Sequence, residues 1–87
     1  DRQGRGVGGA LVEAVAGAAR QAGAHVLWLV TTNANLDALR LYQRHGFRLT
    51  ALHAGSIEAA RAAGAPVPLT GAHGIPLRDE LVLERVL

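Results

Sequence analysis

The chain has 87 residues and a mass of 9.1 kDa, with 49% hydrophobic and 3% aromatic positions, so we expect one compact domain. It contains no cysteine, which excludes disulfides, cysteine metal ligands and a thiolate nucleophile. Every one of its 9 basic residues is arginine, which excludes a P-loop lysine and a Schiff base. The net charge of +2 is too small and scattered for a nucleic-acid interface, and no apolar run approaches the roughly 20 residues of a membrane helix. We therefore expect neither a nucleic-acid nor a membrane partner, and a cytoplasmic location.

The first predicted elements are a helix and a buried strand. Apolar residues over 7–22 recur at steps of three and four, which predicts an amphipathic helix that ends at Gly23. Residues 25–32 are almost continuously apolar and rich in strand-forming side chains. This pattern is typical of a central parallel strand that is covered on both faces, and it places Trp28 in the core.

The rest of the chain predicts a further alternation of helices and strands. In order, we expect a helix over 36–45, a strand over 47–52, a short helix over 56–63 capped by Ser56, an irregular loop over 66–76 and a last strand over 77–87. This order predicts a layered α/β sheet with one or two antiparallel strands at its end. The chain opens at Asp1 directly in a glycine-rich loop, which we interpret as a truncated beginning.

That opening loop is the most informative segment. Its residues are Arg2, Gln3, Gly4, Arg5, Gly6, Val7, Gly8 and Gly9. Four glycines in six positions let a ligand approach the backbone closely, and the free amides of the following helix favour a pyrophosphate. The spacing Gly4-x-Gly6-x-x-Gly9 also fits a dinucleotide fingerprint, but that fingerprint needs an acidic residue at the end of the next strand. The chain has Thr31, Thr32 and Asn33 there.

A second motif follows the buried strand. Asn35, Ala38 and Tyr42 are separated by three and four residues, so they share one stripe of the predicted helix. Gly46 ends that helix, and we expect Phe47 to enter the core. The stripe offers an amide, a small residue and a phenol, which suits a ligand that carries amides and a sulfur.

The two motifs together resemble the GCN5-related N-acetyltransferase superfamily. Gln3-x-x-Gly6-x-Gly8 resembles its pyrophosphate loop, and Asn35 to Phe47 resembles its second conserved region, so the similarity is to the C-terminal half of that fold. The resemblance implies acetyl transfer from acetyl-CoA to an amine, on a partial mixed sheet of the acyl-CoA N-acyltransferase type, with no metal and with a possible homodimer. It implies Tyr42 as the catalytic acid. The coenzyme A-binding residues that it implies are Gln3, Gly4, Arg5, Gly6, Val7, Gly8, Gly9, Asn35 and Ala38.

The resemblance also implies which parts lie elsewhere. The earlier strands and helices of the family, with the oxyanion donor and the general base, precede the segments found here, so we expect residues 1–87 to be inactive or feebly active alone. Residues 54–76 replace a short turn of the family and are interpreted as an insertion. The last strand is expected to insert antiparallel beside strand 25–32.

Each candidate residue has a plainer alternative. Asn35 can be only a helix N-cap, and Tyr42 can be only the polar edge of a packed helix. Arg40, Arg44 and Arg48 could reach the 3′-phosphate of coenzyme A, but the pattern favours a solvated helix face for them. Solvent faces or peripheral strands are expected for Glu13, Glu58, Glu80 and Glu84. The histidines, at positions 25, 45, 53 and 73, share no metal-ligand spacing. A non-catalytic coenzyme A or nucleotide-binding module and a dinucleotide-binding oxidoreductase remain the alternative functions.

Overall fold

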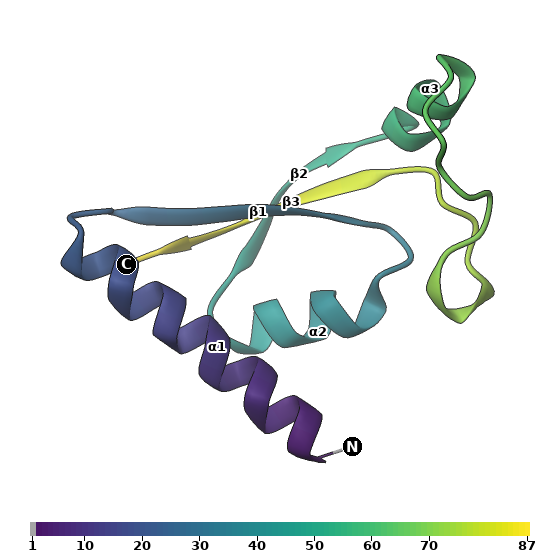
Figure 1. Cartoon of the computed structure of the whole chain (residues 1–87). Coiled ribbons are helices and arrows are strands. Elements are labelled where there is room, and N and C mark those ends of the chain that lie inside the picture. The colour runs from purple at the N-terminus through teal and green to yellow at the C-terminus, as the bar shows by residue number, and fades with distance from the viewer. Residues whose placement is uncertain (1) are drawn as a thin grey trace.

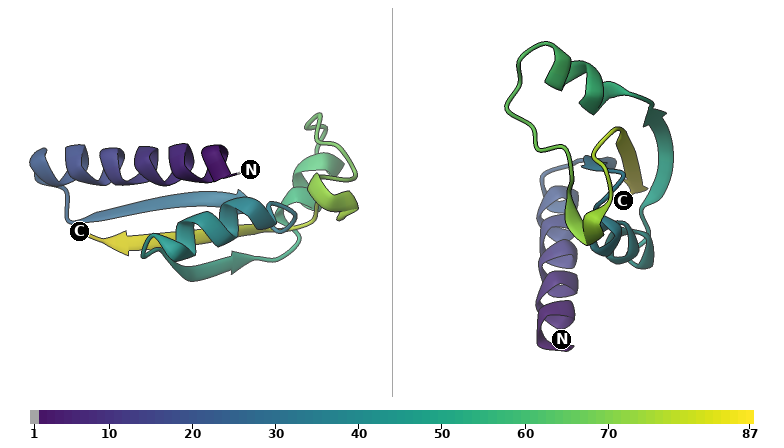
Figure 2. Two further views of the ribbon diagram at one scale, coloured as in Figure 1. Left: turned by 90° about the horizontal axis from the view of Figure 1, so that it is seen from below. Right: turned by 90° about the vertical axis from the view of Figure 1, so that its right-hand side faces the viewer.

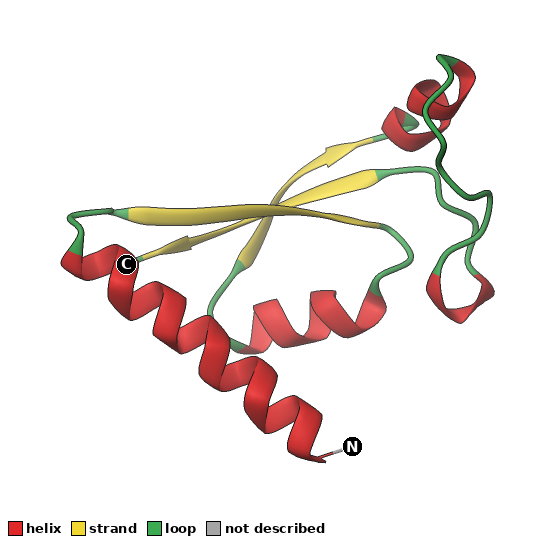
Figure 3. Cartoon of the chain, in the orientation of Figure 1, coloured by secondary structure: helices red, strands yellow, loops and turns green. Residues whose placement is uncertain are grey.

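The computed structural model describes the backbone of residues 2–87 and the side chains of residues 8–87. The elements are α1 (Arg2–Gln21), β1 (Val26–Thr32), α2 (Leu36–Arg44), β2 (Arg48–His53), α3 (Ser56–Ala62), a 3-10 turn η1 (Ala72–Gly74) and β3 (Glu80–Val86) (Figures 1 and 3). The α/β fold class and the order of elements from α1 onward are confirmed. None of the helices in residues 2–87 is long and apolar enough to span a membrane.

Three antiparallel strands form the sheet, in the order β1-β3-β2. The last strand of the sequence therefore lies in the middle, beside β1, as the resemblance implied. Leu83 on β3 stands opposite Leu29 on one side and Leu49 on the other, and its side chain is fully buried. A register shift between Leu49 and Ala51 interrupts the second ladder, which is the signature of a bulge. The centre of the core thus lies on the C-terminal strand.

The prediction for β1 as a central parallel strand covered on both faces is wrong for the described chain. Its ladder in residues 2–87 is with β3, and that pairing is antiparallel. Helices α1 and α2 lie on the same side of the sheet (Figure 2), and no described element covers the opposite face of β1. Trp28 points to that opposite face and is 66% exposed, so it is not a core residue here. The residues of β1 are mostly apolar, but α1 and α2 cover only one face of the strand.

The start of α1 also differs from the prediction. The helix begins at Arg2, so the segment 2–9 that we expected as a loop is helical in its backbone. No proline interrupts this segment, and glycine weakens a helix by up to about 1 kcal/mol relative to alanine without breaking it. The side chains of residues 2–7 lie outside those described, so the expected roles of Gln3 and Arg5 stay predictions.

Helix α2 has the boundaries that its local signals predict. Asn35 is the N-cap, and its Oδ1 accepts a hydrogen bond from the backbone N–H of Ala38 at 3.2 Å. Gly46 follows the C-cap with φ of 86°, a backbone conformation that favours glycine. Phe47 then enters the core and is 5% exposed, as expected. These features fix where α2 begins and ends, and therefore which residues face α1.

The segment between β2 and β3 lies beyond the ends of these strands (Figure 1), and polar contacts tie it to the residues around the start of β3. The N-cap of α3 is Gly55, so the prediction of Ser56 as cap is wrong. Ser56 is instead the first helical residue, and its Oγ donates to Glu80 Oε1 at 3.2 Å. The Gly55 N–H donates to Asp79 Oδ1 at 2.7 Å. The N–H groups of Ile57 and Glu58 both donate to the backbone carbonyl of Arg78, so the first turn of α3 needs no side-chain cap.

Two side chains hold the rest of that segment. Arg61 donates to the backbone carbonyls of Val67, Pro68 and Leu77, so α3 is tied to the loop that follows it. Asn33, which follows β1, makes hydrogen bonds with both the nitrogen and the oxygen of its side-chain amide. Its Nδ2 donates to Pro76 O at 2.9 Å, and its Oδ1 accepts from the backbone N–H groups of Arg78 and Asp79.

Replacing Leu83 tests the placement of the core. We expect Leu83→Ala to lower the free energy of unfolding by about 2–5 kcal/mol, because the cavity would open in the middle of the sheet. Leu69→Ala is the matched control, since Leu69 is 72% exposed, and its cost should stay within about 0.5 kcal/mol. Urea unfolding followed by far-ultraviolet circular dichroism measures both. Equal losses in the two variants would contradict this description of the core.

Candidate active site

The predicted stripe on α2 is present in the structure. Ala38 and Tyr42 lie one turn apart on the same face of α2, and both are half-buried. Asn35 stands at the start of that face, where its Oδ1 is committed to the cap. The N-cap role of Asn35 is therefore confirmed. Its Nδ2 is the part of the amide that capping does not use.

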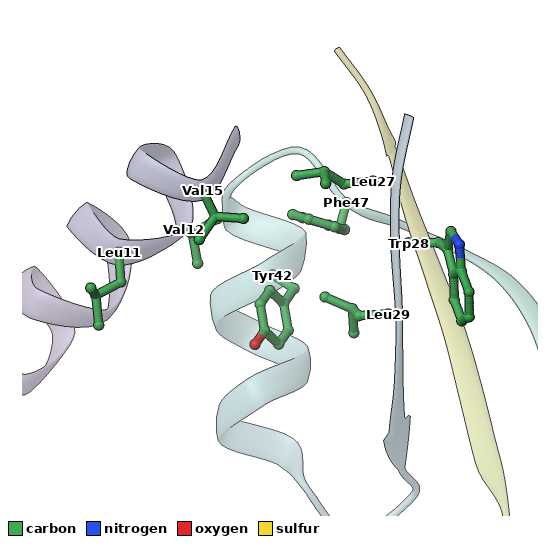
Figure 4. Close-up of a pocket in the computed structure, with 8 residues that line it drawn as sticks. All are labelled: Leu11, Val12, Val15, Leu27, Trp28, Leu29, Tyr42 and Phe47. Carbon is green, nitrogen blue, oxygen red and sulfur yellow. The ribbon is translucent and has the colours of Figure 1, made fainter. Parts of the chain in front are cut away.

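Tyr42 borders an apolar cleft between α1, α2 and β1 (Figure 4). The cleft has a volume of about 270 Å³. Its lining residues are Leu11, Val12, Val15, Leu27, Trp28, Leu29, Tyr42 and Phe47. The indole of Trp28 points away from Tyr42, to the other side of β1 (Figure 4), so the side chains that shape the cleft come from the remaining seven residues.

The phenol of Tyr42 is held by its neighbours in the cleft. Its ring packs edge-on against Phe47, with the ring centroids 5.4 Å apart and an interplanar angle of 66°. The hydroxyl group points away from Leu29 and Phe47 (Figure 4). Apart from this hydroxyl, the side chains that line the cleft are hydrocarbon. The arrangement suits an extended, largely apolar ligand that ends in an atom able to receive a proton or hydrogen bond from the phenol.

The last two glycines of the opening segment lie against α2. A Cβ atom on Gly8 would stand 3.4 Å from Leu41, and one on Gly9 would stand 2.8 Å from Nε2 of His45. The second distance is shorter than real Cβ contacts allow. Gly9 therefore leaves the space that the imidazole of His45 occupies against α1, a packing role that the sequence pattern did not separate from ligand binding.

Glu13 lies on an exposed face, as expected, but its carboxylate is not free there, because it contacts side chains from two other parts of the chain. Its Oε2 accepts from Arg85 at 3.0 Å and contacts His45 Nδ1 at 2.9 Å, and its Oε1 accepts from Arg85 at 3.2 Å. Hydrogen bonds from Arg85, and then from His45, lower the pKa of Glu13 from 4.5 to about 2. The side chain is 49% exposed, so solvent screens this interaction. We call Glu13, His45 and Arg85 the carboxylate cluster.

The low pKa of Glu13 is directly measurable by a carbon-detected NMR titration of its carboxyl group. We expect a midpoint near pH 2 in the unaltered chain and a clear rise toward 4.5 in Arg85→Gln, which removes the largest cause. Because the native pKa lies below the ordinary value, the cluster stabilises the fold above about pH 4.5 and this contribution is lost as the pH falls toward 2.

Arg78→Gln serves as the control for that titration, because Arg78 is exposed and lies outside the cluster. In Arg78→Gln, the pH midpoint of the Glu13 titration should match that of the unaltered chain. An unaltered chain whose Glu13 titrates near 4.5 would show that the cluster does not form in solution.

Comparison with known proteins identifies the family. A model of the Acetyltransferase (GNAT) family matches residues 1–47. The chain is 40% identical over 83 residues to the uncharacterized protein YxbD of Bacillus subtilis strain 168. The matched region covers 95% of this chain and 52% of YxbD. A Bacillus subtilis acetyltransferase solved in complex with CoA is similar with a TM-score of 0.82 and 28% identity, over 94% of this chain and 51% of that one.

A second solved structure agrees. The GNAT family acetyltransferase from Elizabethkingia anophelis with acetyl-CoA bound gives a TM-score of 0.79 and 29% identity, over 94% of this chain and 50% of that one. The chain thus spans about half the length of the relatives that it matches. The fold implied by the two motifs is confirmed by these similarities. The family match contains both the glycine segment and Tyr42, and this chain belongs to the Acetyltransferase (GNAT) family.

Proposed function

We propose that this chain forms the coenzyme A-binding and acid-supplying part of an N-acetyltransferase that moves an acetyl group from acetyl-CoA to an amine. The observation that carries the proposal is the single phenol, Tyr42, at an apolar cleft between α1, α2 and β1. Family membership and the acetyl-CoA or CoA present in the similar solved structures support it.

The cleft fits the pantetheine arm of coenzyme A. This arm is a narrow chain of methylene groups and two amides that ends in sulfur, and the hydrocarbon walls of the cleft match its apolar part. Ala38 has only a methyl group, so the arm can pass close to α2 there. Asn35 can donate from Nδ2 to a pantetheine carbonyl while its Oδ1 caps the helix.

The N-terminal end of α1 would receive the pyrophosphate. The first four amide groups of a helix have no intrahelical acceptor, and the helix dipole favours an anion there. Contacts through the amides of Gly6 and Gly8, as the family loop implies, need the first turns of α1 to open. Opening is inexpensive, because each glycine contributes up to about 1 kcal/mol less to helix stability than alanine does.

In the proposed reaction, the amine nitrogen attacks the carbonyl carbon of the thioester and forms a tetrahedral intermediate. The carbon–sulfur bond then breaks, the acetyl group stays on nitrogen, and the Tyr42 hydroxyl gives its proton to the departing sulfur. The amine loses a proton to a base that we assign to no residue of this chain. The oxyanion donor is likewise assigned to none of these residues.

Tyr42→Phe in the complete acetyltransferase tests this proposal. We expect kcat to fall about 100- to 10,000-fold, because the proton donor is lost, while the dissociation constant of coenzyme A changes little, because the ring still packs on Phe47. Steady-state kinetics and calorimetry measure the two quantities. Gln43→Ala, an exposed neighbour on α2, is the control and should retain activity.

The same variant and a calorimetric binding measurement separate the alternatives. In a non-catalytic coenzyme A-binding module, coenzyme A would bind without acetyl transfer, and Tyr42→Phe would change neither observation. In an oxidoreductase, calorimetry would show NAD binding and no response to coenzyme A.

Residues 1–87 by themselves are expected to turn over acetyl-CoA feebly or not at all, because neither the base nor the oxyanion donor is assigned within them. An acetyl-CoA hydrolysis and transfer assay with a panel of amines measures this. Robust turnover by this chain would show that the essential groups have been misplaced.

A further inference from the structure

The carboxylate cluster joins the two helices that border the cleft to the middle strand of the sheet. Glu13 comes from α1, His45 is the C-cap of α2, and Arg85 comes from β3. Both carboxylate oxygens are engaged, since the two terminal nitrogens of Arg85 reach one oxygen each. This two-point geometry fixes the orientation of the carboxylate as well as its position. The cluster therefore restrains α1 in more than one direction.

Gly9 completes this arrangement from the same face of α1. It lies four residues before Glu13, which is about one helical turn. The imidazole of His45 spans that turn, because its Nδ1 contacts Glu13 at 2.9 Å while a Cβ on Gly9 would stand 2.8 Å from its Nε2. A side chain at position 9 would thus displace the ring that Glu13 holds.

The contact lies beside the cleft on both helices. On α2, His45 follows Tyr42 by three residues, so the two side chains lie on neighbouring turns. On α1, Val12 and Val15, which line the cleft, flank Glu13 in sequence. A shift of α1 against α2 at the cluster would therefore change the distance between the wall of the cleft and the phenol.

We propose that Gly9, Glu13, His45 and Arg85 are positioning residues that set the spacing of α1 and α2, and so the width of the cleft at Tyr42. The catalytic part of this inference rests on the proposed function. It also gives Gly9, which the resemblance implies as a coenzyme A-binding residue, a packing role instead, since Gly9 falls outside the spacing Gln3-x-x-Gly6-x-Gly8. Its role is to seat His45 and not to contact the pyrophosphate.

A double-mutant cycle on the stability of residues 1–87 tests the geometry without coenzyme A. We expect Gly9→Ala to lower the urea midpoint when His45 is present. In the His45→Ala background the same change should raise the midpoint, because the clash is gone and alanine favours the helix. Gly17→Ala is the matched control, since nothing lies within 4 Å of a Cβ there, and it should raise the midpoint in both backgrounds.

The sign of the Gly9 effect decides the packing part. A rise in the midpoint for Gly9→Ala with His45 present, or the same effect in both backgrounds, would overturn it. Because this cycle involves neither acetyl transfer nor coenzyme A, its result is independent of the test of Tyr42.

Kinetics of the complete acetyltransferase test the positioning part. We expect Gly9→Ala and Glu13→Ala to lower kcat about 10- to 100-fold, as for a small misplacement of a reacting group, with the dissociation constant of coenzyme A changed less than about 3-fold. Glu13→Gln keeps a hydrogen-bonding oxygen for Arg85 and should retain more activity than Glu13→Ala. Gly17→Ala should leave kcat unchanged.

Two outcomes would overturn the positioning part. A loss of coenzyme A affinity at unchanged kcat in Gly9→Ala would assign Gly9 to the pyrophosphate instead. Unchanged kcat and affinity in Glu13→Ala, together with a lower urea midpoint, would show a contact that stabilises the fold and nothing more.

Discussion

The pairing of β3 with both β1 and β2 is the interaction on which the rest of this structure depends. β3 is the last element of the chain, yet it supplies the ladders of both other strands. Leu83 fills the centre of the core from this strand, and Arg85, two residues later, reaches the carboxylate of Glu13 on α1. The C-terminal residues thus hold the sheet together and anchor the helix that forms one wall of the cleft.

Local chemistry made α2 and its surroundings predictable. Asn35 is a good N-cap, Gly46 adopts a positive φ that suits glycine, and Phe47 is the next large apolar side chain after the turn. Each signal acts within a few residues, so it can be read from the sequence. The same spacings carried the resemblance to the family, and the family match supports the fold but leaves the role of each site residue as a prediction.

Features that depend on distant partners were not predictable. Trp28 lies in an apolar run, but whether such a run is covered on one face or two depends on which elements stack on it. Glu13 and Arg85 are 72 residues apart in sequence, and no local pattern pairs them. The glycines of the opening segment permit both loop and helix, so composition alone could not decide between these conformations. No side chain caps α3 after Gly55, because the backbone carbonyl of Arg78, distant in sequence, accepts from the N–H groups of Ile57 and Glu58.

The amide of Asn33 has a consequence for the segment that leads into β3. Through Pro76, Arg78 and Asp79 it fastens the stretch just before β3 to the end of β1, independently of what the chain does between α3 and that stretch. Gly64, which follows the C-cap of α3, has open space where its Cβ would stand. Foreign sequence grafted at Gly64, such as an epitope or a fluorescent reporter, would project into solvent. The hydrogen bonds of Asn33 would meanwhile hold the start of β3 in register with β1.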